Sequence, residues 1–98
     1  MRAMVETSTR TRLAENVRLF RTLRGWSQER LADAAGLDRS YLGGIERAQR
    51  NTSVDILARL AQALNVDVSD LLGEQDSRRV GEMLLASIKR SVAARRTD

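Results

Sequence analysis

Apolar residues that recur at helical spacing are the feature that most restricts the fold of this chain. Between residues 11 and 24 the apolar positions include Leu13, Val17, Phe20 and Leu23, separated by four, three and three residues. This spacing places all four side chains on one face of an α-helix, where they can meet a core. The 98 residues contain no proline and are rich in the helix formers Ala, Leu, Arg and Glu. The sequence therefore predicts an all-α fold.

Two short helices joined by a glycine are expected next. Ser27 is placed to cap a helix over residues 28–35, since its hydroxyl can accept from a free N–H group of the first turn. Gly36 can end that helix because glycine adopts a positive φ without strain. Asp38 is the expected cap of the following helix, which runs over residues 39–49. The pattern predicts a helical hairpin with a tight turn.

Three further helices are expected in the second half of the chain. Ser53 can cap a helix over residues 54–65, and Asn65 is its expected C-terminal residue. A five-residue helix follows at 68–72, and Ser77 can cap a last one. The expected apolar face of the first of these helices comprises Val54, Leu57, Leu60, Ala61 and Leu64.

These elements divide the chain into three parts. They are a flexible N-terminal arm over residues 1–10, a helical domain over residues 11–73 and a C-terminal helical extension over residues 74–98. The apolar stripe of the extension is formed by Val80, Met83, Leu84, Ile88 and Val92. A stripe of this kind needs a partner surface. That surface is a second copy of the chain, another protein bound through residues 77–96, or the chain's own helical domain.

The chain contains neither cysteine nor histidine. Their absence removes the usual ligands of transition metals, the thiol nucleophile and the imidazole base together. We therefore expect no metal, no cofactor and no enzymatic activity. The apolar runs are too short to span a membrane, and the N-terminal sequence MRAMVETSTR lacks the apolar segment of a signal peptide. A cytoplasmic protein without a membrane partner is expected.

Charge is distributed unevenly along the chain, whose net charge is +4. Residues 1–50 carry ten arginines and six acidic residues, whereas residues 51–73 carry one arginine and three acidic residues. Sixteen of the seventeen basic residues are arginine, whose planar donor fork suits phosphate and guanine edges. The arginine content can also reflect genome composition. A basic half still favours an anionic partner.

The two short helices and the glycine between them match the spacing of a helix-turn-helix unit. Counted from Gln28 as position one, the unit needs a small residue at position five, where the helices cross, and Ala32 is there. Position nine needs a positive φ and is Gly36. Positions fifteen and eighteen anchor the second helix inward and are Leu42 and Ile45. A generic helical hairpin would meet two or three of these requirements by chance, so all four together favour the helix-turn-helix unit.

Residues 13–72 resemble the XRE family, the phage-repressor and Cro type of helix-turn-helix domain. The resemblance rests on VRLFRTLRGWSQERLADAAGLDRSYLGGIER and on SVDILARLAQALNVDVSDLL. The motif SQERLADAAGLDRSYLGGIERAQRN is especially similar to controller proteins of restriction–modification systems. Thr52 and Val68 stand where proline is common in the family, which affects loop stiffness. The resemblance implies a five-helix phage-repressor-like bundle, here with an additional C-terminal helix.

The same resemblance implies how the domain would bind double-stranded DNA. Its third helix, over about residues 38–47, would enter the major groove, in a homodimer on a near-palindromic operator. Gln28 would bind a phosphate at the start of the second helix. The other residues that would contact DNA are Arg39, Ser40, Tyr41, Arg47, Arg50 and Asn51. The first three would face base edges or adjacent phosphates, and the last three would grip the DNA backbone.

Side-chain chemistry ranks these candidates. The guanidinium of Arg39 can donate to guanine O6 and N7 together, which gives about 1–3 kcal/mol of discrimination between bases. It can instead pair with Asp38. Tyr41 can contact DNA or pack as a surface ring, and Gln28 can bind a phosphate or act only at the helix N-terminus. Arg39 is therefore the best candidate for reading a base.

Three other residues of the expected recognition helix need a separate explanation. Gly43 and Gly44 each cost roughly 1 kcal/mol relative to alanine in a helix. We expect Gly43 to lie against the DNA groove and Gly44 to allow close packing against neighbouring helices, with relief of crowding in the bundle as the alternative for both. Glu46 would be repelled by phosphates, so we expect it to point inward and pair with Arg18 or Arg21.

Two functions are compatible with this pattern. The leading hypothesis is a sequence-specific transcriptional regulator that dimerises through the helix at 68–72 and the apolar stripe, and that is controlled by its own concentration. The alternative is an antitoxin-like protein-interaction module, which binds a partner protein through its C-terminal helix and DNA for autoregulation. A neighbouring restriction–methylation gene pair would favour the first, and a neighbouring toxin gene the second.

Overall fold

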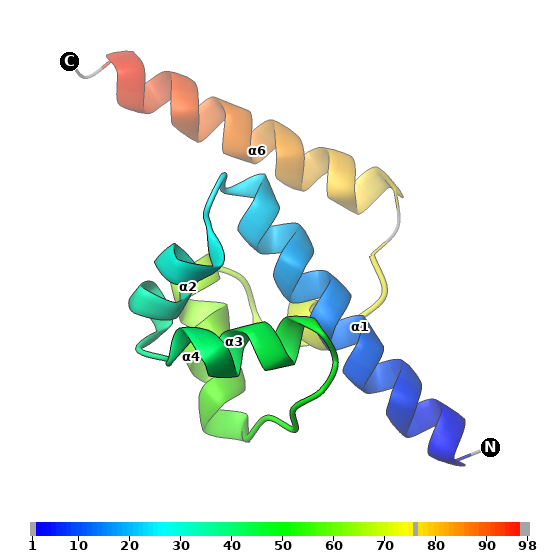
Figure 1. Cartoon of the computed structure of the whole chain (residues 1–98). Helices are drawn as coiled ribbons and strands as arrows, with labels where there is room; N and C mark the ends of the chain where they lie inside the picture. The colour runs from blue at the N-terminus through cyan, green and yellow to red at the C-terminus, as the bar shows by residue number, and fades with distance from the viewer. Residues whose placement is uncertain (1, 76, 97–98) are drawn as a thin grey trace.

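The structure, a computed structural model, describes residues 2–75 and 77–96 (Figure 1). Within these residues it contains six α-helices and no strand. The helices are α1 (Arg2–Leu23), α2 (Gln28–Ala35), α3 (Arg39–Glu46), α4 (Val54–Leu64), α5 (Val68–Leu72) and α6 (Ser77–Arg96). The predicted all-α bundle with an additional C-terminal helix is confirmed.

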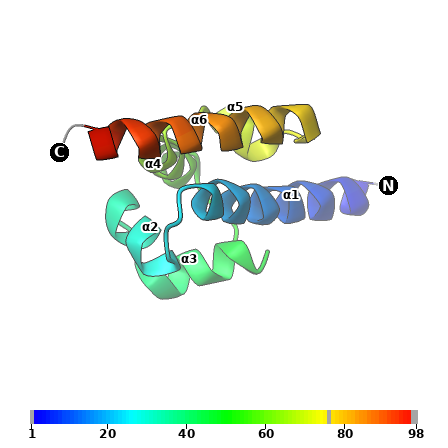
Figure 2. The same cartoon turned by 90° about the horizontal axis from the view of Figure 1, so that it is seen from above.

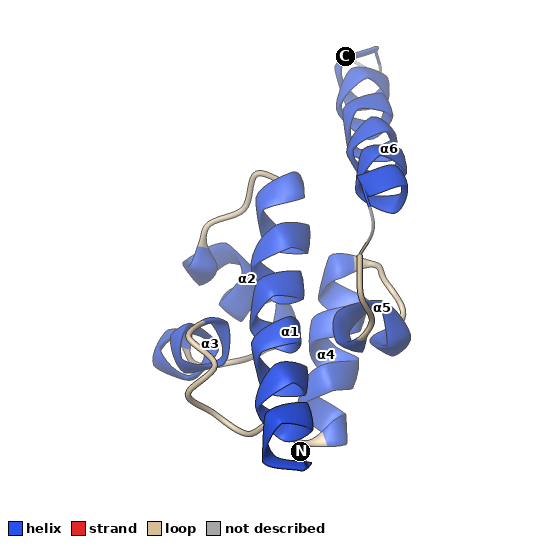
Figure 3. Ribbon diagram, turned by 90° about the vertical axis from the view of Figure 1, so that its right-hand side faces the viewer, coloured by secondary structure: helices blue, strands red, loops and turns tan. Residues whose placement is uncertain are grey.

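Helix α1 is the central element of the bundle. Figure 3 shows α1 between the pair α2 and α3 on one side and the pair α4 and α5 on the other. Helix α6 lies across α1 from α3, as the view in Figure 2 makes clear. This arrangement leaves α3 at the edge of the molecule, well away from the C-terminal helix.

The core is built mainly from aliphatic side chains, and each of the first five helices contributes to it. Its buried members are Leu13, Val17, Phe20, Leu31, Ala32, Ala35, Leu42, Ile45, Leu57, Leu60, Ala61, Leu64 and Leu71. Phe20 is the single aromatic residue among them. The predicted inward residues of α1 to α4 are therefore correct with two exceptions. Leu23 is only partly buried, and Val54 is 77% exposed because it is the first residue of α4 and points beyond the core.

Local capping interactions set most of the helix ends. The Ser27 and Ser53 hydroxyls accept from the backbone N–H groups three residues later, at 3.1 and 3.2 Å. Gly36 and Asn65 end their helices in the left-handed region, with φ of 67° and 56°. These four caps agree with the prediction. Asp38 has the backbone conformation of an N-cap, but its side chain forms no capping hydrogen bond.

Two predicted boundaries are wrong. Helix α1 begins at Arg2 rather than near residue 11, because no proline or glycine interrupts the chain before Gly25. The expected arm at residues 1–10 is thus helical from residue 2, and its flexibility stays a prediction. Helix α3 ends at Glu46 rather than at residue 49, because Ala48 adopts a positive φ of 59° and turns the chain away; this end agrees with the range of about 38–47 that the family resemblance implied.

A buried asparagine on α1, for which the sequence pattern gives no signal, connects α1 to α5. The Asn16 side chain is 5% exposed, and its amide nitrogen donates to the carbonyl oxygens of Asp70, Leu71 and Gly73 at 3.2, 2.9 and 2.8 Å. These carbonyls lie at the end of α5, where a short helix has no internal donors left for them. Asn16 therefore holds α5 against α1.

We expect Asn16→Ala to lower the free energy of unfolding by about 1–3 kcal/mol, since it leaves the buried Leu71 carbonyl oxygen without its side-chain donor, whereas the Asp70 and Gly73 oxygens still accept from Gln75. Urea unfolding followed by circular dichroism measures this change. Gln62→Ala, an exposed amide on α4, is the control and should change stability by less than about 0.5 kcal/mol. Equal effects of the two substitutions would contradict the assigned role.

The apolar stripe of α6 is only partly covered by the chain's own domain. Met83 packs against the core and lines a small pocket with Phe20 and Leu64. Leu84 and Ile88 remain 47% and 51% exposed, as does the neighbouring Leu85 at 53%. The Val92 side chain of the predicted stripe and that of Ser77, the expected cap, lie outside the described side chains, and α6 begins at Ser77 itself.

Candidate nucleic-acid interface

Helices α2 and α3 form a tightly joined unit. Ala32 is 2% exposed at the crossing of the two helices, and its carbonyl oxygen accepts from the Leu37 N–H at 2.8 Å. Gly36 has the positive φ that the turn requires. Leu42 and Ile45 anchor α3 with exposures of 0% and 1%. All four positions predicted for a helix-turn-helix therefore have the expected geometry.

The exposed part of α3 is its N-terminal half. Arg39 and Ser40 are exposed and Tyr41 is half-buried, whereas every residue from Leu42 to Glu46 is buried. Exposure returns in the following loop, at Arg47, Arg50 and Asn51. In helix-turn-helix proteins the N-terminal residues of the second helix are those that contact base edges. The accessible surface of α3 thus coincides with the segment that such proteins use for base contacts.

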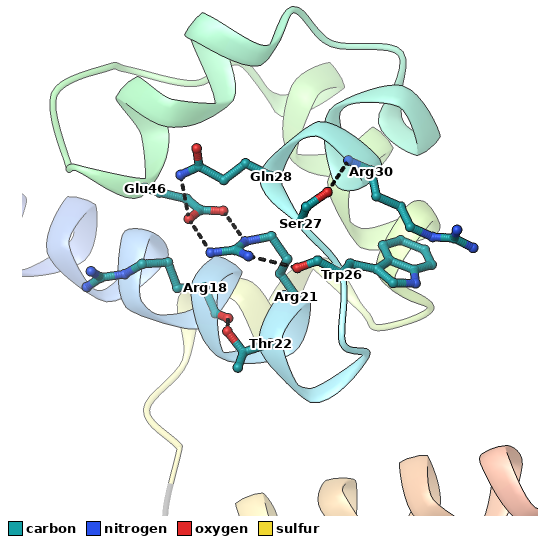
Figure 4. Close-up of polar contacts among 8 residues, drawn as sticks. All are labelled: Arg18, Arg21, Thr22, Trp26, Ser27, Gln28, Arg30 and Glu46. Carbon is teal, nitrogen blue, oxygen red and sulfur yellow. Dashed lines mark hydrogen bonds and ion pairs between the residues drawn. The ribbon is translucent and has the colours of Figure 1, made fainter.

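A buried ion pair ties α1 to the end of α3. The Arg21 Nε and Nη2 atoms donate to the two Glu46 carboxylate oxygens at 2.8 and 3.0 Å, and Nη1 donates to the Trp26 carbonyl at 2.8 Å. The Glu46 side chain is only 2% exposed. The prediction that Glu46 points inward is confirmed, with Arg21 as its partner, while Arg18 is exposed (Figure 4).

Gln28 belongs to the same network. Its Nε2 atom donates to Glu46 Oε1 at 3.1 Å, and Figure 4 shows it reaching the carboxylate from the start of α2. An amide nitrogen carries two hydrogens, so one of them is used by Glu46 and the other stays available for a phosphate. The phosphate contact of Gln28 stays a prediction. The structure adds that the hydrogen bond to Glu46 holds the Gln28 side chain in place.

Two other arginines near this network pack on Trp26. The Arg24 and Arg30 guanidinium carbons lie 5.1 and 5.0 Å from the centre of the indole ring, within the range of cation–π contact. Arg24 also donates through Nε to the Leu64 carbonyl oxygen at 3.1 Å. Arg21 and Arg24 are therefore both bonded within the bundle, whereas Arg18, on the same helix, is exposed.

The loop after α3 is held by a second cluster. The Tyr41 hydroxyl donates to the Asn51 backbone oxygen at 2.9 Å, and the Arg50 guanidinium carbon lies 5.8 Å from the centre of the Tyr41 ring. Arg10 Nη2 donates to the Asn51 side-chain oxygen. Tyr41, Arg50 and Asn51 were all predicted site residues, and the structure brings them together. Arg10 was missed, because its partner is 41 residues away in the chain.

The two glycines lie in the C-terminal half of α3, and Arg47 follows directly after the helix. Arg47 Nε donates to the Gln49 side-chain oxygen at 3.0 Å. Both glycines are buried, and the atoms nearest to a methyl group built on them belong to Arg47 at Gly43 and to Arg50 at Gly44. The nearest atoms at Gly44 thus belong to the loop after α3, and the expectation that Gly44 allows close packing against neighbouring helices stays a prediction. The Arg47 side chain covers Gly43, so Gly43 can contact a DNA groove only if that side chain moves.

The described side chains contain no group of three or more acidic residues that could hold a metal ion. None of the helices, over the part of the chain that is described, is both long and apolar enough to cross a membrane.

The fold and the exposed half of α3 define a helix-turn-helix domain. A profile described as helix-turn-helix matches residues 17–71, more than half of the chain, so the protein belongs to this family. The control protein C.SmaI of Serratia marcescens is 49% identical over 63 residues, which are 64% of this chain and 75% of the relative.

Solved structures agree with this assignment. The hypothetical transcription factor NHTF from Neisseria has a TM-score of 0.68 and 43% identity, over 71% of this chain and 80% of that one. The restriction–modification controller protein C.AhdI from Aeromonas hydrophila has a TM-score of 0.63 and 44% identity, over 65% of this chain and 97% of that one. The resemblance to the XRE family and its controller proteins is confirmed, and the chain is a DNA-binding regulator of the helix-turn-helix class.

Proposed function

We propose that the protein is a sequence-specific transcriptional regulator that binds a near-palindromic operator as a homodimer. The observation that carries this proposal is the exposure of Arg39 and Ser40 at the N-terminal end of α3, with exposed arginines in the loop beyond it. One domain of this size offers limited contact area, so useful specificity requires two copies. A two-fold dimer would present two α3 helices about 34 Å apart, one turn of DNA.

The DNA contacts divide into two kinds. Arg39 and Ser40 are the proposed base-reading residues, and Tyr41 supports them from the edge of α3. The proposed phosphate contacts are Gln28, Arg47, Arg50 and Asn51. Phosphate contacts set the affinity and its salt dependence, whereas base contacts select the operator. Gly43 keeps its proposed place at the groove, beneath Arg47.

The proposed dimer surface includes α5 and the exposed apolar side chains Leu84 and Ile88 of α6. These side chains are about half exposed in the single chain, although an apolar residue on an amphipathic helix normally has a covering surface. The same exposure supports the alternative, an antitoxin-like module that binds a partner protein through residues 77–96. The two proposals differ in what covers α6.

Two measurements test the proposal. Selection of bound duplexes from a random pool should yield a near-palindromic motif, and light scattering should give two chains per molecule. Leu84→Glu combined with Ile88→Glu should produce a monomer that binds the motif far more weakly. A monomeric wild-type protein, or a double variant that remains a dimer with full affinity, would rule out α6 as the dimer surface. A pool without any motif would rule out a sequence-specific regulator.

A further inference from the structure

Gly44 lies where another side chain passes over α3. A methyl group built on Gly44 would lie 2.6 Å from Arg50 Cγ, 3.4 Å from Nε and 3.6 Å from Cδ. These atoms form the stem of the arginine, which cannot give way without moving the whole side chain. At Gly43 the nearest atom is Arg47 Nη1 at 3.0 Å, the far end of a flexible chain. Because Gly44 has no side chain, the Arg50 side chain can pass directly over α3 at this position.

The far end of Arg50 is placed by the cluster around Tyr41. Its guanidinium lies over the Tyr41 ring, and the Tyr41 hydroxyl in turn holds the backbone of Asn51. None of the ion pairs between described side chains includes Arg50, so its charge is not neutralised by a neighbouring carboxylate among them. A cation held in one place without a described counter-ion is suited to an external anion.

Arg10 brings a second guanidinium to the same place from α1. It is fixed by its hydrogen bond to the Asn51 side chain. It also lines one open groove, whose polar lining is completed by Arg50, Asn51, Thr9 and Thr52 and whose apolar lining is Leu13, Leu57 and Leu72. Figure 1 shows the loop that leaves α3 passing beside the N-terminal half of α1, and residues of both segments line the groove. The groove lies beyond the C-terminal end of α3, away from the proposed base-reading half, and this position favours a phosphate of the DNA backbone as the anion it would bind.

We infer that Arg10 and Arg50 form one binding site for a DNA backbone phosphate, and that Gly44 is the positioning residue that lets Arg50 lie in it. This inference rests on the proposed DNA-binding function and adds to it a contact from α1 and a reason for the second glycine. Any side chain at position 44 displaces Arg50 from the Tyr41 ring, and the site then loses one of its two guanidinium groups.

The test measures binding of the full chain to its selected duplex by fluorescence anisotropy over a range of salt concentrations. Arg10→Ala and Arg50→Ala should each make the slope of log affinity against log salt less negative by about 2, because each removes one phosphate contact from each of the two subunits of the proposed dimer. Gly44→Ala should change this slope by the same amount and in the same direction. In a protein that already carries Arg50→Ala, adding Gly44→Ala should have no further effect, since the arginine it displaces is absent.

Gly81→Ala is the matched control, because a methyl group there meets no atom within 4 Å and the residue lies on α6, away from α3. It should leave affinity and slope unchanged. Thermal unfolding of every variant checks that a change in binding is not a loss of fold. If Gly44→Ala alone unfolds, the variant with both substitutions should recover its stability, because the clashing side chain is gone.

Three results would overturn the inference while leaving the proposed function intact. They are wild-type affinity in Gly44→Ala, an equal effect of Gly44→Ala with and without Arg50, and an unchanged salt slope in Arg10→Ala. A double variant that fails to fold would also contradict it, since Arg50 would not be what Gly44 accommodates. Wild-type protein that binds no duplex at any salt concentration would instead overturn the proposed function, and the inference with it.

Discussion

Replacing Arg21 with methionine is expected to lower the free energy of unfolding by about 3–5 kcal/mol. The substitution leaves the Glu46 carboxylate, whose side chain is 2% exposed, without its cation. Removing one partner of a buried ion pair costs more than the pair contributes, because the remaining charge has lost both water and partner. The Trp26 carbonyl oxygen also loses its donor. Urea unfolding monitored by circular dichroism measures the change.

A second variant separates the cost of an unpaired charge from the loss of the pair itself. Arg21→Met combined with Glu46→Met removes both charges, and it should recover most of the lost stability because apolar side chains of similar size often replace a buried pair at no cost. The control is Arg78→Met on α6, whose pair with Glu82 is 89% and 67% exposed. This control should not change stability measurably. If Arg21→Met lowers the free energy of unfolding by less than about 1 kcal/mol, the Glu46 carboxylate does not remain buried, charged and unpaired in the variant, and the explanation is wrong.

The same pair has a consequence for DNA binding. Glu46 accepts from Gln28 as well as from Arg21, so one carboxylate joins α1, the start of α2 and the end of α3. Loss of Arg21 should therefore affect the placement of α3 as well as stability. Below the unfolding transition, Arg21→Met should bind the operator more weakly than wild type.

Arg39→Ala is expected to weaken operator binding by roughly 5- to 150-fold for each half-site of the proposed dimer, because each half-site loses one bidentate contact to a base, at about 1–3 kcal/mol. Affinity for unrelated duplexes should change little, since those contacts are made to phosphates. Competition between operator and random-sequence DNA measures the ratio. Repeating the selection with Arg39→Ala should give a motif that is relaxed at one position in each half-site.

Lys89→Ala is the charge-matched control, because it also removes one positive charge but lies on α6, across α1 from α3. It should leave the discrimination ratio as in wild type. An Arg39→Ala protein with undiminished discrimination would show that Arg39 does not read a base. Equal losses on operator and random duplexes would indicate that Arg39 contacts a phosphate instead.

Local chemistry in the sequence was enough to predict most of the fold. The Ser27 and Ser53 caps bond to N–H groups three residues away, and the turn at Gly36 needs only a residue that tolerates a positive φ. The inward direction of Glu46 also followed from charge alone, since a carboxylate at a DNA surface is repelled. The boundary at Glu46 was missed because Ala48, which ends α3 with a positive φ, is a strong helix former.

Contacts between distant parts of the chain decided the rest. The sequence by itself determined the helix-turn-helix unit, because spacing and caps act within a few positions, and its resemblance to the family supplied the candidate site residues, which stay predictions. It carried no signal for the bonds of Asn16, 54 to 57 residues from its partners, or for the meeting of Arg10 with Asn51. Only the tertiary structure paired Arg21 rather than Arg18 with Glu46, and only it placed Arg50 in the space that Gly44 leaves. Such contacts depend on how helices cross in space, and helical periodicity alone does not determine those crossings.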